Sequence, residues 1–307
     1  MNRLSQDGFA AARDFLKAEA RPLERARFAF HFEGADEAGV WDALGAFQND
    51  DGGFGHALEP DVRAPESSVL CTTIALQVAR AMKAPPPPEP IQSAIGYLLS
   101  TYNADECHFP SLPVVAAESP HAPWWRQEGR RETFDRFDLN PTAEVLGYFY
   151  EHRAGVPDKV LANVSERVVQ ALAKPEEEEM HGLFCCQRLW ETPGLPRRLR
   201  DSVEASCSAK LAKQIETEPE AWKGYTLEPL KAITSPQHPL YPDFREAVEA
   251  NLRFLIDAQQ ADGWWTLNCD WGKRWPDELA QAQRDWKGWV TLETLLVLEA
   301  FGCLPPR

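Results

Sequence analysis

The residues best suited to chemistry follow a glycine-rich turn early in the chain. Glu59 and Asp61 lie two positions apart after that turn, flanked by His56 and Arg63. Two carboxyl groups held this close can divide acid–base work, because the charge of one keeps the other protonated. The alternative is that Asp61 caps the next helix and pairs with Arg63. We expect Glu59 and Asp61 to be catalytic, and His56 and Arg63 to bind substrate.

A second candidate group lies in a proline-flanked loop. His121 stands shortly before Trp124 and Trp125. It is not on a helix face, and imidazole titrates near neutral pH, so it suits a proton shuttle or a hydrogen-bond donor to substrate. The alternative is a loop clamp that binds backbone carbonyls. The two tryptophans are expected to wall a substrate cavity, or else to plug the floor of the fold.

Asp270, between Cys269 and Trp271, is a third candidate acid. An aspartate among indole rings is costly to bury unless it is protonated, paired or used in chemistry. We therefore predict that Asp270 is catalytic. The chain has eleven tryptophans. Those expected to join Trp124 and Trp125 in binding substrate are Trp264, Trp265, Trp271, Trp286 and Trp289.

No metal or cofactor is expected. Asp135 and Asp138 have the spacing of half a magnesium motif, but one such pair arises by chance in a chain with 47 acidic residues. Asp138 precedes Asn140-Pro141 and is better placed to cap a helix. The seven cysteines form no CxxC pair, which argues against a zinc site or a disulfide framework and favours a reduced, cytoplasmic protein.

Charge and hydropathy limit the possible partners. The formal net charge is −15, and the sequence shows no basic footprint for nucleic acid. No run of 18 apolar residues is present, so no transmembrane segment is expected. Residues 1–15 lack the uninterrupted apolar stretch of a secretory signal. A small molecule is the expected partner.

The elements that must position these groups are helices. Apolar residues recur with helical spacing in residues 91–99, 160–172, 244–256 and 292–301, whereas period-two alternation is scarce. We therefore expect an all-α protein with few or no strands. No segment has the composition of a linker, so residues 1–307 are predicted to form a single domain.

Internal repeats suggest how the helices are arranged. Residues 47–54 (FQNDDGGF) are echoed by 258–265 (AQQADGWW), and 222–230 (WKGYTLEPL) by 286–295 (WKGWVTLETL). In these repeats, glycine suits the positive φ that follows a helix, the aromatic covers the helix end, and threonine is expected to cap the next helix. Repeats of this kind predict stacked helical hairpins.

Gln48 to Gly55, with Thr72 to Leu76 (TTIAL) following, resembles the Gln-x-x-Asp-Gly-Gly-(Phe/Trp) turn and Thr-x-x-Ala-Leu helix of squalene–hopene cyclases and protein prenyltransferase β subunits. Gln260 to Trp264 resembles a second copy. The resemblance, close only at these turns, implies an α/α toroid: an α6/α6-type barrel of helical hairpins around an apolar cavity. The chain lacks the Asp-x-Asp-Asp motif and the zinc-ligand spacing of these families, so neither activity transfers residue by residue.

Together, these features predict an isoprenoid-active cyclase, isomerase or lyase that is similar to terpene cyclases and prenyltransferases. A carboxylic acid in a tryptophan-lined central cavity would act without metal on a small, hydrophobic substrate, because aromatic rings stabilise cations. Two alternatives remain open. One is a glycan-active toroid, either a glycoside hydrolase or a polysaccharide lyase, in which Asp61 or Glu59 would pair with Asp270 as acid and base. The other is a binding or scaffold protein without catalysis.

Overall fold

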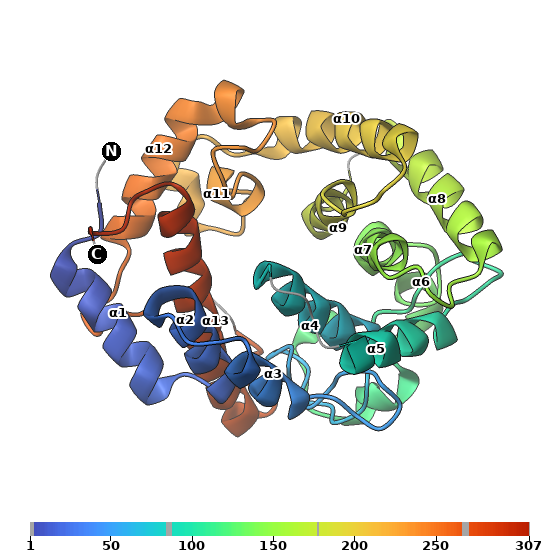
Figure 1. Cartoon of the computed structure of the whole chain (residues 1–307), viewed down its shortest axis with the longest axis horizontal. Helices are drawn as coiled ribbons and strands as arrows, with labels where there is room; N and C mark the ends of the chain where they lie inside the picture. Colours follow the sequence, from blue (N-terminus) through green and yellow to red (C-terminus); the bar gives the residue numbers. More distant parts are fainter. Residues whose placement is uncertain (1–2, 84–87, 177, 266–269, 307) are drawn as a thin grey trace. The chain divides into compact units, whose positions relative to one another are not determined.

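The computed structural model describes residues 3–83, 88–176, 178–265 and 270–306, and these are predominantly helical (Figure 1). Backbone pairing outside the helices is limited to isolated bridges, so the described residues contain no β-sheet. The predicted all-α class is confirmed. The toroidal arrangement and the single domain stay predictions. No described helix is both long enough and apolar enough to cross a bilayer.

The chain forms two compact units. Unit 1 comprises Met1–Ala43 with Ala212–Arg307, and unit 2 comprises Leu44–Leu211. The helices and 3-10 turns of unit 1 are α1 (Gln6–Glu19), α2 (Pro22–Glu33), η3 (Pro219–Lys223), α11 (Pro229–Ala232), α12 (Tyr241–Asp257) and α13 (Pro276–Ala300). Those of unit 2 are α4 (Val69–Ala81), α5 (Pro88–Ser100), η1 (Val114–Glu118), η2 (Pro123–Trp125), α6 (Arg130–Thr133), α7 (Leu139–Glu151), α8 (Asp158–Leu172) and α9 (Met180–Trp190). Helices α3 (Ala38–Gly45) and α10 (Arg197–Gln214) run across the boundaries.

Helix α7 is the centre of unit 2 and packs against α4, α8 and α9. Its start is set by Asp138, whose side chain accepts the N–H of Asn140 (2.8 Å), as the sequence predicted. Helix α4 starts in the same way at Ser68, which accepts the N–H of Cys71 (3.0 Å). Asp61 therefore does not cap this helix. Because α7 is buried almost all round, it holds its neighbours in fixed positions.

Helix α13 packs against α1 and α2 in unit 1, and it starts earlier than the sequence indicated. Trp286 and Trp289 thus lie within a helix, whereas the matching Trp222 lies in the 3-10 turn η3. At Gly288 a Cβ atom would come within 2.9 Å of Ala20 Cβ. Gly288 therefore allows close packing and does not end a helix. The two copies of the WKG repeat adopt different structures.

The other repeat does form the same turn in both units. Gln48 Nε2 donates to the carbonyls of Gly52 (3.0 Å) and Pro90 (3.2 Å). Gln259 Nε2 donates to the carbonyl of Gly263 (3.0 Å) and to a carbonyl of α1 (2.8 Å). In both copies one glutamine therefore closes the turn and ties it to a neighbouring helix.

Threonines in the helices that follow the two turns have a different role from the one predicted. Thr72 Oγ1 accepts the N–H of Phe54 (3.0 Å), and Thr291 Oγ1 accepts the N–H of Trp265 (3.1 Å). Both threonines lie inside helices and not at the first position, so neither caps a helix. They anchor the aromatic residue that follows the turn.

Candidate active site

The two loops that carry the predicted acids and histidine lie side by side in unit 2. The backbone N–H groups of Arg63 and Ala122 donate to the carbonyls of Pro120 (2.8 Å) and Asp61 (2.9 Å). These bonds form an isolated antiparallel bridge next to His121. The sequence predicted both loops as candidates but not that they pair.

All three candidate side chains in these loops are nearly buried. Glu59 is 9% exposed, Asp61 5% and His121 6%. Ionisable side chains are seldom this buried unless they are paired, hydrogen-bonded or used in chemistry. The loops thus place two carboxyl groups and one imidazole in a region that is largely closed to water.

One ring nitrogen of His121 is assigned by its partner. Nδ1 lies 2.7 Å from the carbonyl oxygen of Ser119. A carbonyl can only accept, so Nδ1 carries a proton, and in the neutral ring Nε2 is the basic nitrogen. This bond to a backbone carbonyl is what we expected if His121 only clamps its loop. It also fixes the tautomer that a proton acceptor at Nε2 requires.

Glycine allows the acid-bearing loop to fold back on itself. At Gly55 a Cβ atom would lie 2.3 Å from the carbonyl oxygen of Glu66. The next two residues, His56 and Ala57, have φ values of +53° and +60°, a left-handed conformation that non-glycine residues seldom adopt. His56 is exposed, and its Nε2 lies 2.8 Å from Asn49 Oδ1. Its side chain thus braces the turn.

The two neighbouring tryptophans differ in their surroundings. Trp125 packs against an apolar cluster behind the loops, made of Val62, Ala64, Leu112, Ala116 and Phe134. Trp124 is 54% exposed. Of the two residues predicted to wall a cavity, Trp125 therefore supports the acid loop, and Trp124 is the one open to a ligand.

Asp270 belongs to unit 1 and is exposed. Its Oδ1 accepts the N–H of Gly272 (2.8 Å), an aspartate turn that the positive φ of that glycine permits. Asp270 was predicted to be catalytic because it was expected to be buried among indole rings, and this burial is not found. Its carboxylate instead binds a nearby backbone N–H in an exposed turn. Residues 266–269 of the same loop lie outside the described residues. A pairing of Asp270 with Asp61 stays a prediction.

The five tryptophans of unit 1 that were predicted to bind substrate fall into two groups. Trp265 and Trp271 are core residues, 3% and 2% exposed, and the Trp265 indole N–H donates to the carbonyl of Leu255 (2.7 Å). The other three of the five, Trp264, Trp286 and Trp289, are half-buried. Two of these face cations: Lys287 Nζ lies 4.1 Å from the ring centroid of Trp264, and Arg27 Cζ lies 4.9 Å from that of Trp289.

An open hollow of about 220 Å³ borders the glycine turn of unit 2. Its lining residues are Gln48, Asn49, Asp50, Gly52, Glu89, Pro90 and Ser93. Neither Glu59 nor Asp61 lines it, and small-molecule sites are commonly larger, roughly 300–1,000 Å³. The hollow therefore does not define the active site.

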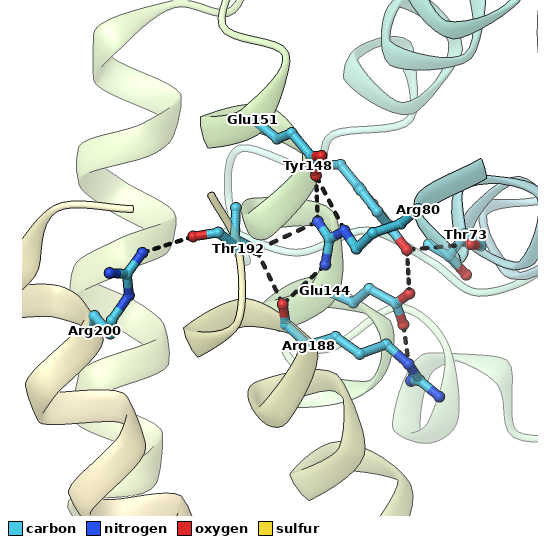
Figure 2. A network of polar contacts seen from close by, with 8 residues as sticks. All are labelled: Thr73, Arg80, Glu144, Tyr148, Glu151, Arg188, Thr192 and Arg200. Atoms are coloured by element: carbon cyan, nitrogen blue, oxygen red, sulfur yellow. Dashed lines mark hydrogen bonds and ion pairs between the residues drawn. The ribbon is translucent and has the colours of Figure 1, made fainter. Parts of the chain in front are cut away.

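The sequence did not reveal a buried polar network between α4, α7 and α9 (Figure 2). Glu144, with a side chain 2% exposed, accepts the Tyr148 hydroxyl (2.6 Å) and an Arg188 N–H (3.1 Å). Arg80 lies over the Tyr148 ring at 4.5 Å and pairs with Glu151 (2.6 Å). Each helix thus contributes a charge that a neighbouring helix compensates.

The network also determines the chemistry of a thiol. Cys185 Sγ lies 3.7 Å from Glu144 Oε2. Burial, and then the charge of Glu144, raise the pKa of the Cys185 thiol, and the same two causes raise the pKa of Tyr148. Because the thiolate is the nucleophilic form, these surroundings disfavour a nucleophilic role for Cys185. We regard the network as structural.

The acidic pair of residues 135 and 138 is also used for structure. Arg130 Nε pairs with Asp135 (3.0 Å), while Asp138 caps α7. Within the described ranges, no group of three His, Cys, Asp or Glu side chains is arranged to hold a metal ion.

Comparison with known proteins adds no family. No protein-family model matches the chain, and no curated protein matches it. Functional inference therefore depends on the geometry of the paired loops.

Proposed function

We propose that the protein is an acid-catalysing enzyme that acts on a small hydrophobic isoprenoid as a cyclase, isomerase or lyase. The observation that carries the proposal is the paired-loop site of unit 2. There, Glu59 and Asp61 are almost buried in a loop whose backbone pairs with the loop of His121, and Val62 and Ala64 of the same loop belong to an apolar cluster. Water-poor surroundings suit a carboxylic acid that must stay protonated and an intermediate that water would destroy.

The chemistry is balanced without a cofactor. One carboxylic acid, Glu59 or Asp61, gives its proton to an alkene carbon. The O–H bond breaks, the π electrons form the new C–H bond, and a carbocation remains. Loss of a proton from a neighbouring carbon, with His121 Nε2 or a carboxylate as the acceptor, restores a double bond. Trp124, whose ring is not packed into the core, is the aromatic residue of these loops that we assign to stabilise the cation.

The test is turnover of detergent-solubilised prenyl alcohols, followed by product analysis. Asp61→Asn and Glu59→Gln keep shape but remove the acid, and the variant of the true acid should lose about 10²–10⁴-fold in kcat. Asp105→Asn, an exposed carboxylate of the same unit, is the matched control and should keep wild-type turnover. Full activity in both acid variants would reject the proposal.

A glycan-active enzyme is the second candidate, and the exposure of Trp124 favours it. An open indole ring in the loop that pairs with the acid loop suits stacking on a sugar face, with one carboxyl as acid and the other as base. Oligosaccharides screened in the same assay separate the two. Glycan cleavage that Trp124→Ala weakens through KM, and that Asp61→Asn abolishes through kcat, would replace the isoprenoid proposal.

A further inference from the structure

A buried arginine of unit 1 lacks partners for part of its guanidinium. Arg27, on α2, has a side chain only 2% exposed. Its Nη2 donates to Glu293 Oε1 on α13 (2.7 Å). Its Nε and Nη1 are buried and have no acceptor within hydrogen-bonding distance in the part of the chain that the structure describes.

This arrangement is unusual because buried arginine N–H groups are normally satisfied. A guanidinium has five N–H donors and pairs best with an oxyanion that meets it through two oxygens. Here the Arg27 guanidinium donates one hydrogen bond, to a single carboxylate oxygen of Glu293. An oxyanion that offers more acceptors would bind Arg27 better than Glu293 does.

The partner of Arg27 is placed so that it can be exchanged. The Glu293 side chain is 41% exposed, so its carboxylate can turn into water at little cost. One turn earlier on α13, the half-buried Trp289 lies under the guanidinium, with 4.9 Å from Cζ to the ring centroid. Cation–π contact keeps Arg27 in place when Glu293 leaves.

We infer that Arg27 and Trp289 form a binding site for an oxyanion, a carboxylate or phosphate group of a small ligand, from which Glu293 is displaced. The ligand's oxygens occupy the Nη2 position now held by Glu293 and accept from further N–H groups. The site lies wholly within unit 1 and is independent of the function proposed for the acid loops.

Thermal unfolding of the full-length chain tests this inference with inorganic phosphate and, separately, acetate, against chloride at equal ionic strength. In Glu293→Gln the competing charge is gone, and phosphate should bind at least about tenfold more tightly than in wild type. At a concentration of about ten times Kd, the Tm of this variant should rise by about 3 °C. A response to acetate as well identifies any oxyanion as the ligand class, whereas a response to phosphate alone restricts it to phosphates.

Two variants control for non-specific effects. Glu249→Gln releases Arg245, an exposed arginine of the same unit, and should respond to phosphate no more than wild type. Arg27→Met should lose the response. If Arg27→Met does not fold, titration calorimetry of phosphate into Glu293→Gln and Glu249→Gln decides alone. Equal affinity in these two variants, or a Tm rise equal to that in chloride, would overturn the inference.

Discussion

The two glycine turns, residues 47–54 of unit 2 and 258–265 of unit 1, share a backbone but differ in how their side chains are used. In both turns the N–H of the positive-φ glycine donates to the carbonyl three residues earlier: Gly52 N to Asn49 O is 2.9 Å, and Gly263 N to Gln260 O is 2.8 Å. In unit 2 the turn also holds the acid loop, because Asp51 Oδ1 accepts the hydroxyl of Ser67 (2.6 Å).

The second turn has no such attachment in the described residues. Asp262, the counterpart of Asp51, is exposed, and the side chain of Gln260 bonds only locally, to the carbonyl of Ala258 (3.0 Å). In contrast, Asn49 donates to Ser67 Oγ (3.0 Å). The backbone of the motif thus serves the fold in both units, whereas only in the first copy do the aspartate and the residue after the glutamine bind the loop that carries Glu59 and Asp61.

Replacement of the positive-φ glycine should have the largest effect and should be severe in both copies. Gly52→Ala would bring Cβ within 2.5 Å of Ser93 O, and Gly263→Ala within 2.2 Å of a backbone carbon of Ala11. Left-handed strain and the clash together should cost about 3–5 kcal/mol in urea unfolding. Gly34→Ala has positive φ but nothing within 4 Å, so only about 1–2 kcal/mol is expected. Equal losses at all three positions would show that the turns do not depend on close approach.

Loss of the closing glutamine should be milder and equal in the two units. Gln48→Ala and Gln259→Ala each remove two side-chain hydrogen bonds to backbone carbonyls. Each change should lower the free energy of unfolding by about 1–3 kcal/mol. Gln170→Ala, which removes an exposed helix-surface bond, is the matched control and should cost under about 0.5 kcal/mol. A difference of more than about 1 kcal/mol between the two turns would contradict their structural equivalence.

The features that the sequence predicted well depend on local interactions. The cap at Asp138 binds an N–H two residues away, and the turn at Gly52 requires a positive φ, so neighbouring residues suffice to predict them. The pairing of the Asp61 and His121 loops depends on backbone bonds between distant segments, which no local pattern encodes.

Two other features show where pattern reading fails. Identical WKG letters form a 3-10 turn at Trp222 and part of a helix at Trp286, because the packing of Gly288 on Ala20 decides the second case. Glu144 lies in an apolar helix, and its partner Arg188 is on α9, so only the packed structure reveals their pairing.

The smallest effect separates the two turns most sharply. Asp51→Ala leaves the Ser67 hydroxyl and the Gly53 N–H without their acceptor, whereas Asp262→Ala removes an exposed carboxylate. We expect about 1 kcal/mol for the first change and under about 0.5 kcal/mol for the second. Stability alone does not identify the cause, since any lost bond would reduce it.

Hydrogen exchange supplies the missing readout, because it reports which segment loosens. In Asp51→Ala, amides of residues 55–67 should exchange faster, while those of α7 stay at the wild-type rate. Asp262→Ala should leave every segment of unit 1 unchanged. If Asp51→Ala leaves residues 55–67 protected, the bridge to the His121 loop is enough to hold the acids. The side chains of the first turn would then be as dispensable to the site as those of the second.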